Sequence, residues 1–314
     1  MRLPLLTDRT ALAQNRKNLG AFEPGLRHIL HLCGLADAAT AVLANTHGGS
    51  MPVFAVNDDL ILKLFPEICR EFYDNELSSL RLLAGRPPFA IPQIRACGTV
   101  ETWHYLLMTR VPGVQLATLW PTADDTQRAT LLESIGAATA ALHRLHTPTP
   151  AETAAWRSFM TQQVANVIEH HSKTGLSENL LAQLPAYLAP ALDRIATAPV
   201  TFLHTELMLE HIFVDPTQLT VTSMIDFEPS TVGAPEYDFT GVPVFLTLGR
   251  PPLLRSFLRG YGYPWNPATS PRLLMSYLIL HRYSNLGWFQ TFLGDRRPAE
   301  VTRLEELEKL WWSA

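Results

Sequence analysis

The chain changes character at Pro112-Gly113, and this change constrains the fold more than any other feature of the sequence. Between about residues 50 and 111, short runs rich in Val, Ile, Leu and Phe alternate with turn residues, which is typical of antiparallel strands. After residue 120, long segments with helical periodicity take over and are interrupted by prolines. We therefore predict an α+β protein in two lobes, residues 1–111 and 112–314, the first β-rich and the second mainly helical.

Turn residues mark the strands of the first part. Asn57-Asp58-Asp59 and Glu101-Thr102 each separate two apolar runs, as the turn of a hairpin does. A helix is predicted over 67–83, because Gly85 and Pro87-Pro88 end its pattern. The expected strands cover residues 51–56, 60–65, 94–100 and 104–111.

The second part is expected to hold a small β-rich island among its helices. Asp124-Asp125 precedes the longest helical segment, and Asp215-Pro216-Thr217 provides a turn inside the island. His143 and His146 end this first helix, where a cationic imidazole suits the helix dipole. The expected elements are helices at 125–146, 156–171 and 177–197 and strands at 200–204, 211–214 and 219–225.

Composition excludes several classes of protein. The net charge of the 314 residues is −4, and no run of Lys or Arg suggests a nucleic-acid partner. No stretch of 18 residues is apolar enough for a membrane span, and the N-terminus does not resemble a signal peptide. Cys33, Cys69 and Cys97 fit neither a disulfide framework nor a zinc site. We therefore expect a cytoplasmic protein with reduced thiols.

Two acids flank the predicted hairpin of the β island. Glu206 follows a strand that ends at His204, and Asp226 follows the strand that ends the hairpin. Phosphoryl transfer needs a residue that orients the attacking hydroxyl and accepts its proton, and a ligand for the metal that bridges the phosphates. Glu206 fits the first role and Asp226 the second. The alternative is a hairpin whose acids are only solvated.

Lys63 lies in the otherwise apolar strand segment LILKLF. A lysine that points from such a strand into the interior needs a partner, because burying an isolated charge is costly. Glu76 shares the apolar face of the following helix with Phe72 and Leu80. A kinase uses such a pair to hold nucleotide phosphates. The alternative is an edge-strand lysine that extends to water.

A glycine pair precedes the first of these strands. Gly48, Gly49 and Ser50 are candidates for a turn that covers the phosphates with backbone N–H groups. An ordinary turn would have the same composition, and the sequence contains no GxGxxG or Walker pattern.

The ordered set of motifs resembles the aminoglycoside phosphotransferases and their choline-kinase-like relatives. His204-Thr205-Glu206 takes the place of the family's His-Gly-Asp, and His211 takes the place of its Asn. Ile225-Asp226-Phe227 is intact, and Gly233-Ala234-Pro235-Glu236-Tyr237-Asp238 is similar to Gly-Asp-Pro-x-Tyr-Asp. The resemblance covers residues 50–290, and short strings elsewhere look closest to the hygromycin B phosphotransferases.

This resemblance implies a protein-kinase-like fold that uses ATP and Mg²⁺, with a role in antibiotic resistance. His204 and Asp238 would keep the catalytic loop in shape, and Met108 to Val111, which includes Arg110, would be the hinge that binds adenine through its backbone. The residues implied in nucleotide binding are Lys63, Glu76, Gly48, Gly49, Ser50, Met108 and Arg110.

Two positions depart from the family pattern. Glu206 is one methylene longer than Asp, and catalysis is sensitive to displacements of that size. His211 offers a nitrogen where Mg²⁺ prefers oxygen, so His211 binds the metal weakly, favours Mn²⁺, or leaves the metal to Asp226. A nucleotide-binding pseudokinase is therefore an alternative. A zinc hydrolase that uses His204, Glu206 and His211 is a distant one, because the paired histidines of a zincin helix are missing.

The acceptor is the least constrained part of the prediction. Glu210, Glu228 and Glu236 lie close in sequence to the loop and would suit a cationic sugar, the small-molecule partner that we expect. An amino alcohol, a macrolide or a metabolite are the alternative acceptors. Trp288 and Phe289 would line a sugar pocket if exposed, but a place in the core is favoured. Both a monomer and a homodimer fit the sequence.

Overall fold

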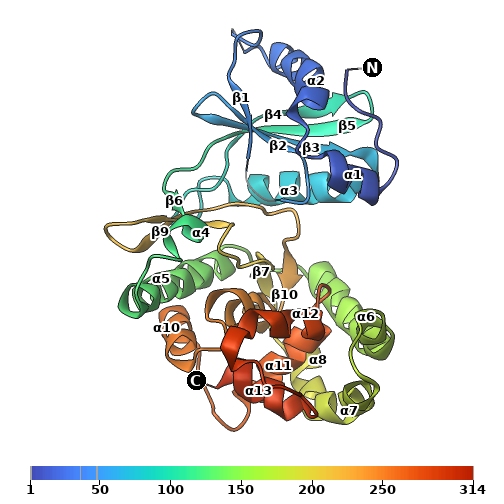
Figure 1. Cartoon of the computed structure of the whole chain (residues 1–314), viewed down its shortest axis with the longest axis vertical. Helices are drawn as coiled ribbons and strands as arrows, with labels where there is room; N and C mark the ends of the chain where they lie inside the picture. The colour runs from blue at the N-terminus through green and yellow to red at the C-terminus, as the bar shows by residue number, and fades with distance from the viewer. Residues whose placement is uncertain (1, 36, 47–48, 314) are drawn as a thin grey trace. The chain divides into compact units, whose positions relative to one another are not determined.

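In the computed structural model, which describes residues 2–35, 37–46 and 49–313, the chain divides into two compact units. The first unit runs to Pro112 and also includes Ser223–Pro229, from much further along the chain. The second comprises Gly113–Thr222 and the residues from Ser230 onward. Figure 1 shows a sheet in the first unit and mainly helices in the second. The α+β prediction is therefore confirmed.

An antiparallel sheet with the strand order β1-β2-β3-β5-β4 forms the centre of the first unit. Strand β1 is only three residues long and was not predicted. The strands are β1 (Leu43–Asn45), β2 (Val53–Val56), β3 (Leu60–Pro66), β4 (Ile94–Val100) and β5 (Trp103–Thr109). The helices are α1 (Arg9–Asn15), α2 (Leu19–Leu32) and α3 (Arg70–Leu83), which the short η1 (Glu67–Cys69) precedes.

The register of β3 and β5 decides which side chains share a face of the sheet. Lys63 pairs with Leu106, and residues directly opposite each other point to the same side. Helix α3 covers this face, where the rings of Phe65 and Tyr73 lie 5.7 Å apart. Helix α2 covers the other face through Phe22, whose ring contacts that of Phe54. The alternating pattern of LILKLF therefore positions Lys63 opposite α3.

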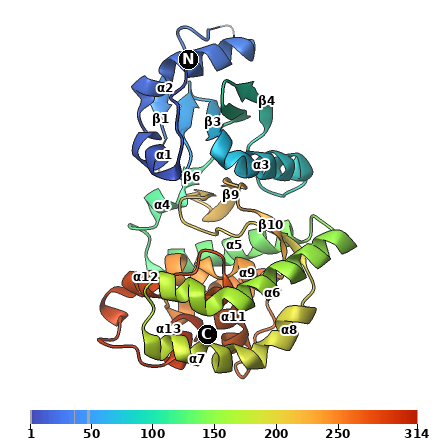
Figure 2. The same cartoon turned by 90° about the vertical axis from the view of Figure 1, so that its right-hand side faces the viewer.

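The second unit contains most of the helices, which Figure 2 shows from a second direction. They are α4 (Leu116–Leu119), α5 (Asp125–His143), α6 (Pro150–Lys173), α7 (Glu178–Leu188), α8 (Leu192–Thr197), α9 (Pro235–Asp238), α10 (Pro251–Tyr261), α11 (Ser270–Leu280), α12 (Leu286–Gln290) and α13 (Leu304–Trp312). Short helical turns are η2 (Ala189–Ala191), the π-helical η3 (Val242–Leu246) and η4 (Thr291–Arg296). Its strands are β6 (Val114–Gln115), β7 (Thr201–Leu203), β8 (Ile212–Asp215), β9 (Thr220–Met224) and β10 (Thr231–Gly233).

Local signals set the helix boundaries of the second unit. Asp124 and Thr149 each form a capping box at the start of α5 and α6, which satisfies backbone N–H groups that have no partner within the helix. The single helix expected over 177–197 is instead three segments, with Pro185 inside the first and Pro190 in the second. Proline lacks the N–H of a regular helix and disturbs the turn before it.

Helices α5 and α10 approach each other through two glycines. A Cβ on Gly136 would lie 2.2 Å from the carbonyl oxygen of Phe257, and one on Gly260 would lie 1.9 Å from that of Glu133. Only glycine permits this backbone contact. The core of the unit includes Trp311 and Trp312, which are buried. Within the described residues, no helix has the length and apolarity that crossing a membrane requires.

Candidate active site

Lys63 is the centre of a buried charge cluster in the first unit. It is 6% exposed, and its Nζ lies 2.7 Å from Glu76 Oε2, the ion pair that the sequence predicted. The same Nζ is 2.7 Å from Asp226 Oδ1 and 2.9 Å from Glu228 Oε2. One ammonium group therefore faces three carboxylates from α3 and the 223–229 segment.

These contacts change the proton affinities within the cluster. Burial by itself would lower the pKa of Lys63, but the carboxylates of Asp226, Glu228 and Glu76 raise that pKa well above its ordinary value. Burial raises the pKa of Glu76 to about 7, against the opposing effect of Lys63. Lys63 therefore remains cationic, as a group that binds phosphate must.

Glu228, which the sequence suggested as an acceptor-binding residue, is also a member of this charge cluster. Ser50 Oγ donates to Glu228 Oε1 over 2.8 Å, and Asn75 Nδ2 donates to the Glu228 carbonyl oxygen over 2.6 Å. With its ion pair to Lys63, Glu228 belongs to the charge cluster of the first unit. No local pattern could predict this contact, because the partners are far apart along the chain.

The cluster has the chemistry of a divalent-cation site. Glu76, Asp226 and Glu228 each offer a carboxylate oxygen, and these oxygens lie within 4.8 Å of one another. Hard oxygen ligands are those that Mg²⁺ prefers. Asp226 has a left-handed backbone with φ of 69°, a conformation that Asp tolerates better than most residues. The residues present therefore fit the metal that a phosphotransferase uses.

The structure describes only part of the turn that was predicted to cover the phosphates, namely Gly49 and Ser50. Gly48 lies outside the described residues. Gly49 has φ of 82°, a left-handed conformation that favours glycine, and a Cβ there would lie 3.7 Å from the carbonyl oxygen of Met51. Ser50 is tied to Glu228 through its hydroxyl group. The last residue of this turn therefore contacts the charge cluster.

The predicted hinge follows β5. Met108 is buried and lies opposite Ile61, on the same face of the sheet as Lys63. The N–H of Arg110 donates to the carbonyl oxygen of Asp59 over 2.7 Å, so that this donor is already used within the unit. A cavity of about 690 Å³ opens on the opposite face, where Leu60 and Leu107 line it.

In the second unit, Asp238 holds the loop that carries Glu206. Its carboxylate is fully buried and accepts the N–H groups of His204, over 3.0 Å, and of Thr205. His143 Nε2 also donates to it over 2.8 Å, and His143 Nδ1 forms a 2.9 Å hydrogen bond with the hydroxyl group of Tyr261. Burial would raise the pKa of Asp238, but its bonds to His143 and His204 hold that pKa below its ordinary value.

Sequence reasoning missed His143, whose position at a helix end suggested only a favourable charge. Its ring instead links α5 to the carboxylate that holds the loop. The burial of a histidine on the apolar side of a long helix is the signal that would have found it.

Thr205 occupies the place of the family's glycine with a left-handed backbone, φ of 71°. This conformation is unfavourable for a β-branched residue. Its N–H bond to Asp238 and a 3.3 Å bond from Arg282 Nη2 to its hydroxyl oxygen hold it in place. Arg282 is anchored in turn, because its own N–H donates to the hydroxyl group of Tyr237 over 2.8 Å.

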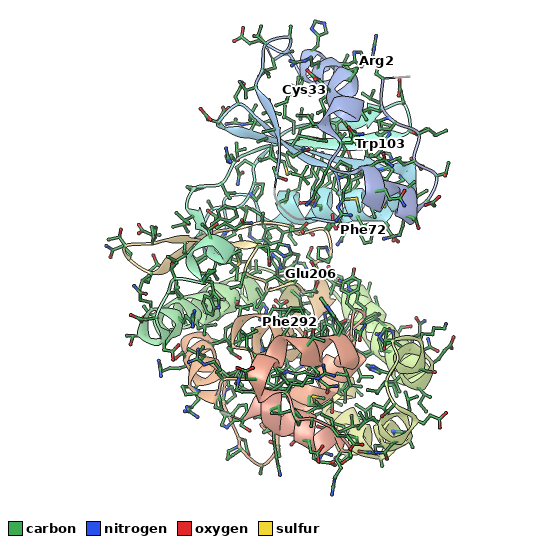
Figure 3. The ribbon with its side chains drawn as sticks, in the orientation of Figure 1. Arg2, Cys33, Phe72, Trp103, Glu206 and Phe292 are labelled. Atoms are coloured by element: carbon green, nitrogen blue, oxygen red, sulfur yellow. The ribbon has the colours of Figure 1, made fainter. Side chains whose placement is uncertain are left out.

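Glu206, which is labelled in Figure 3, is a partly exposed residue of this loop. Its N–H donates to His204 Nδ1 over 3.3 Å, and His211 Nδ1 donates to its carbonyl oxygen over 3.0 Å. His204 is buried, with its ring centroid 6.0 Å from that of His211. Because Nδ1 of His211 is engaged with the loop, any metal contact of this residue would use Nε2.

The two remaining acceptor candidates, Glu236 and Glu210, form hydrogen bonds with different residues. Glu236 is partly buried and accepts a 3.4 Å bond from the hydroxyl group of Tyr263. Glu210 is exposed on the turn before β8, where Gln115 Nε2 donates to its carbonyl oxygen over 2.7 Å. Within the second unit, Glu210 and Glu236 therefore contact different residues.

Replacing Asp238 with asparagine tests the support of the loop. We expect the free energy of unfolding to fall by about 3 kcal/mol, because an amide cannot accept all the N–H groups that the carboxylate satisfies and leaves buried donors unpaired. Urea unfolding measures the change. Asp193→Asn, at an exposed position in α8, is the matched control. Equal stability of the two variants would contradict this role.

Residues 42–273, most of the chain, match the model of the phosphotransferase enzyme family. The chain belongs to this family. It is therefore a phosphotransferase, as the sequence motifs predicted. No curated protein matches the chain in sequence.

The chain is similar in fold to solved structures of aminoglycoside phosphotransferases. A GDP complex of an aminoglycoside 2'-phosphotransferase IIIa mutant is 17% identical, with a TM-score of 0.64 over 90% of this chain and 95% of the other. APH(3'')-Id from Streptomyces rimosus, with ADP and streptomycin, is 21% identical, with a TM-score of 0.57 over 84% and 97%. At these identities the comparison shows the fold, and the predicted kinase-like fold is confirmed.

Proposed function

We propose that this phosphotransferase moves the γ-phosphoryl group of ATP to a hydroxyl group of an aminoglycoside-like small molecule. The observation that carries the proposal is the buried Lys63 among Glu76, Asp226 and Glu228. A cation beside metal-ligating carboxylates is what the phosphates of a nucleotide require. The nucleotide complexes of the similar structures support this assignment.

In the proposed reaction, the acceptor oxygen attacks the γ-phosphorus and the bond to the β,γ-bridging oxygen breaks. ADP leaves, and the hydroxyl proton passes to the carboxylate of Glu206. Lys63 binds the phosphates and Glu76 orients it. Asp226 would hold Mg²⁺, which neutralises charge on the phosphates when it is bound. Asp238 and His204 keep the loop in the conformation that presents Glu206.

Product analysis tests this proposal. The purified protein is incubated with Mg²⁺–ATP or Mg²⁺–GTP and hygromycin B, kanamycin, streptomycin or gentamicin, and the products are examined by mass spectrometry. We expect one acceptor to gain a single phosphoryl group and ADP to form in equal amount. Phosphorus NMR of that product identifies the hydroxyl. ADP formation without a phosphorylated acceptor would contradict the proposal.

A further inference from the structure

A cluster of aromatic rings lies in the second unit, and we call it the aromatic platform. It consists of Phe245 in η3, Trp288 in α12 and Phe292 in η4, with ring centroids 4.9 to 5.8 Å apart. Trp288 was expected in the core, but it is 50% exposed, whereas its neighbour Phe289 is buried. Large exposed aromatic side chains that form a cluster are typical of binding sites.

The aromatic platform borders the loop that carries Glu206. A Cβ on Gly241 would lie 3.0 Å from the carbonyl oxygen of Leu207 and 3.6 Å from Phe245 Cδ2. The residue after Glu206 and the ring of Phe245 therefore flank the same glycine. Figure 3 labels Glu206 and Phe292, which belong to this unit.

The backbone under Phe245 is also unusual. Val242–Leu246 forms a π-helical turn, a rare conformation that occurs frequently at functional sites. It is followed by Leu248, whose φ is 50°, a left-handed value that is uncommon for leucine. The ring of Phe245 therefore belongs to an irregular helical turn.

A second connection runs from the platform to the loop through Arg282. Arg282 Nη2 donates to the Thr205 hydroxyl oxygen over 3.3 Å, and its guanidinium carbon lies 5.3 Å from the ring centroid of Tyr283. Tyr283 is 46% exposed and lies three positions before the start of α12. The segment from Arg282 to Phe292 thus joins the catalytic loop to the exposed rings.

The charge of this region argues against a highly cationic acceptor. Residues 239–294 contain no Asp or Glu but five arginines. Arg250, Arg259 and Arg272 pair with acids from outside this segment. Arg282 donates to Thr205 of the loop, and Arg255 is exposed. An acceptor with several ammonium groups would find arginines and aromatic rings in this segment, with no carboxylate from the segment to bind it.

We infer that the aromatic platform binds the acceptor, and that the acceptor is a hydroxylated molecule with an apolar face and at most one or two positive charges. This inference rests on the proposed function, and it narrows the acceptor class. The rings of Phe245 and Trp288 contact the apolar face, and the reacting hydroxyl points toward Glu206. A glycoside with few amino groups, such as a macrolide, has this chemistry.

Steady-state kinetics with Trp288→Ala test the role of the platform. With erythromycin as acceptor, we expect KM to rise about tenfold while kcat stays within about twofold, because stacking on an indole is lost but the reacting groups are unchanged. The KM for ATP should not change. Trp288→Phe should restore most of the affinity, and Ile168→Ala, an exposed apolar residue in α6, is the control.

The acceptor panel separates failure of this inference from failure of the proposed function. Erythromycin and spectinomycin represent weakly charged acceptors, and kanamycin and gentamicin represent highly cationic ones. We expect a higher kcat/KM for one of the weakly charged acceptors. Turnover of kanamycin or gentamicin alone, with the same KM in Trp288→Ala, would overturn the inference but leave the phosphotransferase intact. No turnover of any acceptor would instead contradict the proposed function.

Discussion

Replacing Glu206 with glutamine is expected to lower kcat by roughly 10²- to 10⁴-fold, the usual contribution of a general base. Glutamine keeps the size of the side chain and leaves the backbone bonds to His204 and His211 in place. It cannot accept the proton of the hydroxyl group. Because Glu206 is partly exposed, the variant should fold with unchanged stability. Acceptor-dependent ADP release measures the effect.

Two further variants make this result specific. Glu300→Gln removes an exposed acid elsewhere in the same unit and should leave kcat unchanged within about twofold. Glu206→Asp restores the shorter acid of the related enzymes and should retain far more activity than Glu206→Gln, since its carboxylate still accepts a proton. If Glu206→Gln keeps the wild-type kcat, the base is another residue.

Replacing Lys63 with methionine is expected to lower kcat/KM for ATP by roughly 10²- to 10³-fold, as loss of one electrostatic contact to a reacting phosphate typically does. Methionine fills much of the space but removes the charge. Glu76, Asp226 and Glu228 then face one another without a cation. We expect their pKa values to rise and the free energy of unfolding to fall by about 3 kcal/mol.

Kinetics and urea unfolding distinguish the two effects of this substitution. Lys309→Met, at an exposed position in α13, is the matched control and should cost less than about 1 kcal/mol. Because three acids lose their partner, the Lys63→Met variant should regain stability at lower pH, where they bind protons. Near-normal kcat/KM for ATP in this variant would show that Lys63 does not bind the phosphates.

The sequence predicted the parts of the site that local patterns encode. The apolar strand around Lys63 and the apolar helix face around Glu76 were sufficient to predict their ion pair, because strand and helix periodicity place both side chains inside. The acids after β7 and β9 were located by the same strand patterns.

Long-range contacts could not be predicted in this way. Lys63 and Asp226 are 163 positions apart, and no periodicity shows that Ser223–Pro229 joins the first unit. From the sequence, Glu228 was therefore predicted to bind the acceptor. Similarly, only the fold shows that His143 supports Asp238 and that Trp288 is exposed beside Phe245 and Phe292. The roles of the site residues were predicted from the family resemblance. The contacts in the structure added roles for Glu228 and His143.

The central claim is tested most directly by ADP release from Mg²⁺–ATP, measured with and without each acceptor in wild type and Glu206→Gln. The account predicts that at least one hydroxylated acceptor stimulates release, and that the stimulation disappears in the variant. ADP release that no acceptor stimulates, with Mn²⁺ also tried, or stimulation that is equal in Glu206→Gln would contradict it.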